Sequence, residues 1–148
     1  MTSRYGLLFL LLAAPAASHA QSAADSSAIR ATALDYVEGW YEGNPERMGR
    51  ALHPELVKRI VVSDTATKRS VLQNMGVSAL VNGTRHGWGK ETPKDRQQKD
   101  VTILDVFGNT ASVKAVMADW IDYIQMAKVD GRWLIVNVLW ERKPEKKG

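Results

Sequence analysis

Few side chains in this sequence could serve as an acid or a base, the simplest catalytic role. Such a group must lie within hydrogen-bonding distance of the proton that it moves, so its place in the fold matters as much as its type. The carboxylate and imidazole candidates are His53, Glu55, His86, Asp105 and Asp122. We treat Asp122 as the best candidate for a general base and His53 as a weaker one, for reasons that depend on the elements that carry them.

No motif for metal, nucleophile or phosphate chemistry accompanies these residues. The chain has no cysteine, and one of its three histidines lies in an N-terminal segment that we expect to be removed. Without an H-E-x-x-H pattern, the other two do not predict a zinc site. There is no nucleophile elbow, and Gly87-Trp88-Gly89 lacks the strand-to-helix setting of a phosphate-binding loop. We therefore expect neither a metal nor a cofactor.

Asp122 lies in the last forty residues, where the sequence predicts a β-hairpin. Asp130-Gly131 separates two runs of β-branched and aromatic residues, a pattern typical of a two-residue turn. Such a turn sets a register that places Val129 opposite Arg132 and, if unbroken, Asp122 opposite Leu139. Both faces of this hairpin are largely apolar, so both need a cover.

Helices and a strand that could supply one cover come earlier in the chain. Helical spacing of apolar residues predicts a first helix over 26–42, and Asn44-Pro45 predicts the start of a short second helix that stops near Leu52. A β-prone run over 56–62 predicts a first strand, in which Lys58 protects a sheet edge. A third helix is predicted over 66–82. Its inward residues are Val71, Leu72, Met75 and Ala79.

A polar connection over 83–99 follows the predicted third helix. It is longer than a passive loop usually is, and we expect Trp88 within it to cover a pocket mouth or to contact a partner. Residues 101–107 and 110–117 predict another hairpin. Because the inward positions of the two hairpins are one residue out of phase, we expect a bulge or a sharp bend within 117–121.

Several segments, in this order, resemble the bacterial putative lumazine-binding branch of the nuclear transport factor 2-like superfamily. The segments are Tyr36-Val-Glu-Gly-Trp-Tyr-Glu-Gly43, Leu52-His-Pro-Glu-Leu56, Gly87-Trp-Gly-Lys90, Asp119-Trp-Ile-Asp-Tyr123 and those at 103–106, 111–114, 130–133 and 136–141. The resemblance covers the whole domain and implies an α+β cone, in which three N-terminal helices pack on a curved antiparallel sheet. It implies no single activity, because the superfamily holds isomerases, dehydratases, cyclases, binding proteins and interaction domains.

In such a cone the first helix and the concave face of the sheet enclose a pocket, and aromatic walls would suit a flat ligand. The side chains expected to line it are Tyr36, Trp40, Trp120, Asp122, Ile124, Met126, Trp133 and Asn137. The aromatic residues could equally well fill a core, and Asn137 could be a buried amide that Tyr36 or Asp122 satisfies. The residues alone leave both interpretations open.

The pocket suggests a function of one of two classes. The first is the non-catalytic binding of a small aromatic heterocycle, such as a lumazine-like molecule. The second is an isomerase- or dehydratase-like enzyme with Asp122 as its base, since burial would raise the pKa of this carboxyl group. His53 lies near the place where the resemblance implies a catalytic carboxylate in isomerases, although a surface or capping role explains it more simply. A purely structural interaction domain is a further alternative.

The outer face of the final hairpin predicts a protein partner. In the unbroken register it carries Ile121, Tyr123, Leu134, Val136, Val138 and Trp140. An apolar patch of this kind is uncommon on a soluble monomer, and a twofold axis is the simplest way to bury it. We therefore expect a homodimer.

Residues 1–20 have the features of a secretory signal peptide. Arg4 precedes a short apolar run, and Ser18-His19-Ala20 is a typical cleavage site. The run is too short to span a membrane. We expect cleavage near Ala20, one domain over 21–148, and a periplasmic or secreted protein with no membrane contact. The formal net charge of +4, part of which leaves with Arg4, is too small to predict nucleic-acid binding.

Overall fold

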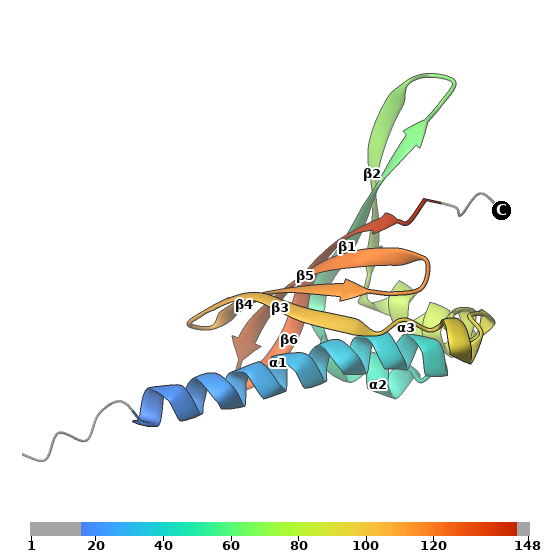
Figure 1. Ribbon diagram of the computed structural model, residues 1–148. Helices are drawn as coiled ribbons and strands as arrows, with labels where there is room; N and C mark the ends of the chain where they lie inside the picture. Colours follow the sequence, from blue (N-terminus) through green and yellow to red (C-terminus); the bar gives the residue numbers. More distant parts are fainter. Residues whose placement is uncertain (1–15, 145–148) are drawn as a thin grey trace, which may run out of the picture.

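The computed structural model describes residues 16–144, with side chains from residue 23 onward. In this part of the chain, three α-helices lie along one side of a six-stranded sheet (Figure 1). The helical elements are α1 (Ala16–Glu42), α2 (Pro45–Ala51), α3 (Val77–Arg85) and the 3-10 turns η1 (Trp88–Glu91) and η2 (Lys94–Arg96). The strands are β1 (Leu52–Asp64), β2 (Arg69–Gly76), β3 (Asp100–Phe107), β4 (Thr110–Val116), β5 (Trp120–Val129) and β6 (Arg132–Arg142). Their order is β2-β1-β6-β5-β4-β3, and only β1 and β6 are parallel neighbours. The predicted α+β class is confirmed.

The apolar face of α1 packs on the sheet, as its helical spacing predicts. Ile29, Ala33 and Val37 are fully buried and belong to one hydrophobic core with sheet residues such as Val113 and Ile124. Helices are held in a fold chiefly by packing of this kind, which is why the inner face of α1 could be found from spacing alone. The predicted signal segment, residues 1–20, lies outside the residues whose side chains are described.

A cap and a charge cluster join α2 to α1. The Asn44 side chain accepts a hydrogen bond from the backbone N–H of Arg47 at 2.9 Å, so the predicted N-cap is confirmed. The guanidinium of Arg47 then reaches back to α1, where it pairs with Asp35 at 2.9 Å, with Glu42 at 2.8 Å and also with Glu38. Three carboxylates on one guanidinium keep the short helix α2 against the long one.

The third helix predicted over 66–82 is wrong in its first two-thirds. This stretch forms β2, and α3 begins only at Val77. Val71 and Leu72, which were expected to face inward, are 60% and 59% exposed. Helical spacing in a short segment is a weak signal, and the pairing of β2 with β1 along its whole length outweighs it.

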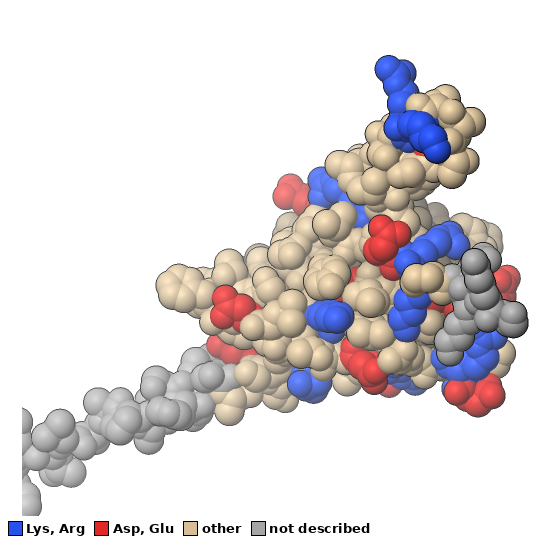
Figure 2. Space-filling view, turned by 45° about the horizontal axis from the view of Figure 1, so that its top comes forward, with Lys and Arg blue, Asp and Glu red and all other residues tan. Residues whose placement is uncertain are grey.

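The turn between β1 and β2 is stabilised by the Asp64 side chain. Asp64 accepts a hydrogen bond from the backbone N–H of Ala66 at 2.8 Å, and Lys68 adopts a positive φ of 58° before β2 begins. The β1–β2 hairpin projects beyond the helices (Figure 1), and we call its outer part, residues 61–72, the arm. Lys and Arg side chains gather at the tip of the arm (Figure 2).

The final hairpin confirms the predicted turn. Val129 faces Arg132 across Asp130-Gly131, and Ala127 faces Leu134. Both turn residues have a positive φ, of 48° and 78°, as this kind of two-residue turn requires.

The register beyond that point differs from the prediction because Val136 is an extra residue on β6. It has no partner between the pairs Met126–Ile135 and Gln125–Asn137, and it therefore forms a β-bulge. A shift of one residue moves every later side chain to the opposite face.

Beyond the bulge, each side chain of β6 points to the face opposite the one predicted for it. Val138 is fully buried and Trp140 turns toward the helices, so their predicted place on the outer face is wrong. Asn137 and Leu139 turn outward instead. Asp122 keeps its inward direction but faces Trp140 rather than Leu139.

Between β4 and β5 the chain makes the sharp bend that we expected within 117–121. The backbone N–H of Met117 donates to the Trp120 carbonyl at 2.9 Å, and Val116 pairs with Ile121 on the returning strand. β4 and β5 thus form a tight hairpin of their own. β3 contains a further bulge: Ile103 pairs with Val113 and Asp105 with Ser112, so Leu104 between them has no partner on β4.

Candidate functional site

Three buried polar side chains meet between α1 and the sheet. Tyr36 comes from α1, Lys58 from β1 and Asp122 from β5. The Tyr36 hydroxyl donates to Asp122 Oδ2 at 2.8 Å, while Lys58 Nζ donates to Asp122 Oδ1 at 2.8 Å and to Tyr36 Oη at 2.6 Å. Lys58 is 6% exposed and Asp122 is fully buried. We call these three residues the polar triad.

The polar triad balances charges that would be costly to bury singly. Burial lowers the pKa of the Lys58 ammonium, and the negative charge of Asp122 opposes that shift. Burial also raises the pKa of the Tyr36 phenol well above its usual value of 10.0, and the neighbouring carboxylate adds to the effect. The phenol therefore stays protonated, and both oxygens of Asp122 keep a hydrogen-bond donor.

Lys58 is a residue of the candidate site that the sequence analysis did not predict. We predicted it at a sheet edge, but β1 lies between β2 and β6, and Lys58 points inward on the same face as Leu56. The available signal was strand alternation, which places residues 56 and 58 on one side of the sheet. Its partner Asp122 is two strands away, and no local pattern shows that pairing.

A cavity of about 490 Å³, with five aromatic side chains in its walls, lies beside the polar triad. We call it the tryptophan cavity, because Trp40, Trp88, Trp120 and Trp140 line it together with Tyr36 and Lys58. Its remaining walls are Met48, Gln73, Met75, Leu80, Met117, Asp119 and Arg142. Trp120 packs edge-to-face against Trp40, with ring centres 6.0 Å apart, and against Trp140, at 6.1 Å. Lys58 Nζ lies 4.9 Å from the centre of the Trp140 ring.

Trp88 stands where the tryptophan cavity opens to solvent. Its side chain is 54% exposed, and its ring stacks on His86 with centres 6.1 Å apart. It also rests on Gly83 of α3, where a Cβ atom would lie 2.7 Å from the indole. Trp88 thus lines the tryptophan cavity, and its role as a lid or as a contact to a partner stays a prediction.

Two indole N–H groups in the cavity walls have no conventional acceptor. The Nε1 atoms of Trp40 and Trp120 are buried, and neither hydrogen-bonds to any residue that the structure describes. Both rings belong to the edge-to-face stack, in which the positive edge of one ring meets the negative face of another. Such contacts only partly replace a hydrogen bond. The aromatic wall is therefore held by packing more than by polar contacts.

The predicted pocket residues divide into three groups. Tyr36, Trp40 and Trp120 line the tryptophan cavity, and Asp122 lies directly behind its wall. Ile124 and Met126 are buried in the core under α1 and are absent from the cavity lining. Trp133 and Asn137 form the third group and lie elsewhere.

Trp133 and Asn137 each have structural partners away from the cavity. Trp133 Nε1 donates to Asp25 Oδ1 at 3.0 Å, near the start of the described part of α1. Asn137 lies on the outer face, where its carbonyl oxygen accepts from Arg59 at 2.6 Å and its amide contacts Gln125. Asn137 is therefore neither a residue of the pocket nor an amide that Tyr36 or Asp122 satisfies, because the bulge at Val136 reverses the direction of its side chain.

The remaining acid–base candidates do not approach the polar triad. His53 Nδ1 accepts a hydrogen bond from the Glu55 backbone N–H at 3.2 Å, which is a local capping contact. Asp105 is exposed and pairs with Ser112, as predicted. Of the candidates, Asp122 hydrogen-bonds to two residues that line the tryptophan cavity, and His86 stacks on Trp88, another lining residue.

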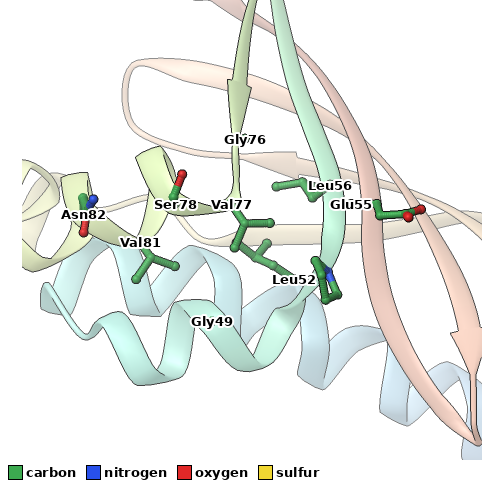
Figure 3. Close-up of a pocket in the computed structure, with 10 residues that line it drawn as sticks. Gly49, Leu52, Glu55, Leu56, Gly76, Val77, Ser78, Val81 and Asn82 are labelled. Carbon is green, nitrogen blue, oxygen red and sulfur yellow. The ribbon is translucent and has the colours of Figure 1, made fainter.

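A second, wider hollow lies between α2, α3 and the start of β1, with a volume of about 740 Å³ (Figure 3). Its lining is small and apolar apart from Ser78, Asn82 and Glu55, and Glu55 points away from the other labelled side chains. It is an open depression without a buried polar or aromatic group. The tryptophan cavity is therefore the better candidate site, although it is smaller.

Neither a membrane-spanning helix nor a metal site is present within the described residues. None of the helices there combines the length and the hydropathy needed to cross a bilayer. The same residues contain no group of three histidine, cysteine or carboxylate side chains placed to hold a metal ion.

Comparisons with known proteins identify the family and the fold. Residues 24–141 match the family described as putative lumazine-binding. An NTF2-like protein of unknown function from Shewanella baltica has a TM-score of 0.66 at 19% identity, covering 83% of this chain and 97% of its own. An NTF2-like protein with a cystatin-like fold from Novosphingobium aromaticivorans has a TM-score of 0.65 at 12% identity, covering 88% and 89%. An NTF2-like protein of unknown function from Methylobacillus flagellatus has a TM-score of 0.58 at 20% identity, covering 81% of this chain and 93% of its own. No curated protein matches the sequence.

Proposed function

The chain belongs to the putative lumazine-binding family and has the NTF2-like fold, and from this premise we propose that it binds one flat aromatic molecule in the tryptophan cavity. The observation that carries the proposal is the lining itself, in which four tryptophans and Tyr36 surround about 490 Å³. Pockets of a few hundred Å³ with aromatic walls and a small number of polar groups are typical of small-molecule sites. A bicyclic heterocycle of the lumazine kind fits such a space.

Binding without catalysis suits the polar triad better than general-base chemistry does. Asp122 is fully buried, and both of its oxygens already accept hydrogen bonds, from Tyr36 and from Lys58. A base must reach the substrate proton directly or through one water, whereas Asp122 lies behind Tyr36 and Lys58, which line the cavity in its place. In this proposal the polar triad forms a polar part of the wall of the site and takes no proton from the ligand.

Intrinsic tryptophan fluorescence tests the proposal directly. We expect lumazine, a pterin or riboflavin to quench the emission of the purified protein with a dissociation constant below about 1 mM. Replacing Trp88 by alanine should weaken binding between about twofold and tenfold, which is the usual contribution of one aromatic contact. Phe107→Ala is the matched control, because Phe107 is 82% exposed and is not part of the cavity lining. Absence of binding by all three heterocycles would overturn the proposed function.

We also propose that the protein is exported and forms a homodimer. Export is supported by the charged start, apolar run and cleavage pattern of residues 1–20. The mass of the protein recovered from a Gram-negative periplasm should correspond to a chain that starts at Gln21; an intact chain found in the cytosol contradicts export.

The dimer proposal keeps the outer sheet face but changes its residues. With Val138 in the core and Trp140 in the cavity wall, the exposed apolar side chains on that face include Tyr123, Leu139 and Val61, which are 44%, 47% and 47% exposed. They lie on the neighbouring strands β5, β6 and β1. Ile121, Leu134 and Val136, which were also predicted there, are partly buried.

A further inference from the structure

A polar cavity of about 700 Å³ adjoins the tryptophan cavity. We call it the basic cavity, because its lining includes the cations Arg96, Arg142 and Lys143 and a single carboxylate, Asp119. Arg142 and Asp119 also line the tryptophan cavity, so the two spaces meet at these residues.

The cations of the basic cavity are only partly neutralised. Arg96 lies 3.9 Å from Asp119, and both side chains are more than half exposed, so this ion pair is weak. Lys143 Nζ donates to the neutral side chain of Gln98 at 2.7 Å. Arg142 makes no ion pair with any residue in the described part of the chain, and its guanidinium lies 5.8 Å from the centre of the Trp140 ring.

The charge at the other side of the tryptophan cavity is already balanced. There Lys58 is paired with Asp122 and hydrogen-bonded to Tyr36. An anionic group on a ligand would therefore gain little at Lys58. The unneutralised positive charge lies at the junction of the two cavities, where Arg142 touches both spaces.

We propose that the ligand of the tryptophan cavity is an aromatic molecule with an anionic substituent, a carboxylate or a phosphate, which Arg142 binds at the junction with the basic cavity. The proposal rests on the proposed function and adds the chemical class of the ligand. The ring system occupies the tryptophan cavity, and the anion points toward Arg142, with Arg96 and Lys143 adding to the local positive potential. Guanidinium groups suit this role because their planar donors match carboxylate and phosphate oxygens.

Two molecules with the same ring system and nearly the same shape, one anionic and one neutral, isolate the contribution of the anion to the affinity. The dissociation constants of 2-naphthoate and 2-naphthamide are measured by tryptophan fluorescence at low salt. We expect the wild-type protein to bind the carboxylate about tenfold more tightly, the usual effect of one charge-assisted hydrogen bond. Raising the salt concentration should reduce the difference, because the junction is open to solvent.

Variants assign the effect to one residue. Arg142→Gln should bring the ratio of the two dissociation constants from about tenfold to about one. Arg69→Gln is the matched control, since it removes the same charge from the exposed end of β2, and it should keep the preference. A preference that survives in Arg142→Gln, or that disappears equally in both variants, overturns the assignment to Arg142.

Failure of this inference differs from failure of the proposed function. If the heterocycles bind and 2-naphthoate has no advantage over 2-naphthamide, the anion site is overturned while the aromatic site stands. If none of these molecules binds, both proposals fall.

Discussion

Lys58 and Asp122 form a buried ion pair, and the Tyr36 hydroxyl hydrogen-bonds to both of them. Their distance of 2.8 Å and near-zero exposure mean that each residue depends on the other to offset its own loss of hydration. At the same time, the Lys58 ammonium lies close to the ring of Trp140, which links the polar triad to the aromatic wall.

Breaking this pair from one side should be more harmful than removing both charges. We expect Asp122→Asn to lower the free energy of unfolding by about 3–5 kcal/mol, because it leaves the Lys58 ammonium buried without its countercharge. The double variant Lys58→Met with Asp122→Asn should recover part of that loss, since no buried charge remains. Chemical denaturation of the two proteins measures the difference. A double variant that is less stable than Asp122→Asn would show that the pair is not the dominant contact.

Glycines decide how closely the helical elements can approach one another. Gly39 on α1 lies under α2, where a Cβ atom would be 2.9 Å from the backbone nitrogen of Met48 and 3.2 Å from its Cα. Gly89 in η1 is closer still, with a Cβ position 2.1 Å from the Trp40 carbonyl oxygen. These contacts hold α2 and η1 against α1, and η1 in turn carries Trp88 at the cavity.

Two helical glycines make a matched pair for testing this packing. Gly39→Ala should destabilise the protein by about 1–3 kcal/mol, because the backbone of α2 must move to admit the methyl group. Gly49→Ala, in α2, should stabilise it by about 0.5–1 kcal/mol, since nothing lies within 4 Å of that position and alanine is the better helix former. Thermal unfolding of both variants gives the comparison; equal effects of the two substitutions would refute the role of Gly39 in the α1–α2 contact.

At the scale of the whole molecule, the sheet has one face under the helices and one face open. The open face carries Tyr123, Leu139 and Val61 around a polar group in which Arg59 bonds Asn137. The arm extends the sheet beyond the helices (Figure 1), and Leu72 adds another exposed apolar side chain on it. A second copy placed on this face by a twofold axis would cover these residues.

Light scattering tests the dimer. We expect the wild-type protein to be a dimer at micromolar concentration and Leu139→Lys to be a folded monomer, because a charge on the outer face would lie inside the interface. Val71→Lys is the control: Val71 is 60% exposed and belongs to the opposite face of the arm. Val138 is unsuitable for this test because it is fully buried, and a lysine there would unfold the protein. A wild-type monomer at high micromolar concentration contradicts the proposed interface.

The sequence by itself determined the features that depend on neighbours along the chain. The inner face of α1 follows from helical spacing, the start of α2 from Asn44-Pro45, and the last turn from Asp130-Gly131. Resemblance to a known family supplied the fold class and pointed to Tyr36, Trp40 and Trp120, which do line the cavity.

Only the tertiary structure decided which side chains meet across the sheet. The bulge at Val136 moves Trp140 into the cavity wall and Asn137 out of it. The sequence does not reveal this bulge because residues 134–140 are all apolar except Asn137, so there is no alternation for an extra residue to interrupt. The pairing of Lys58 with Asp122 joins residues 64 positions apart, through two strands whose order in the sheet no local pattern fixes. The site therefore depends on long-range register, whereas the turns and helix faces depend on short-range geometry that a sequence displays directly.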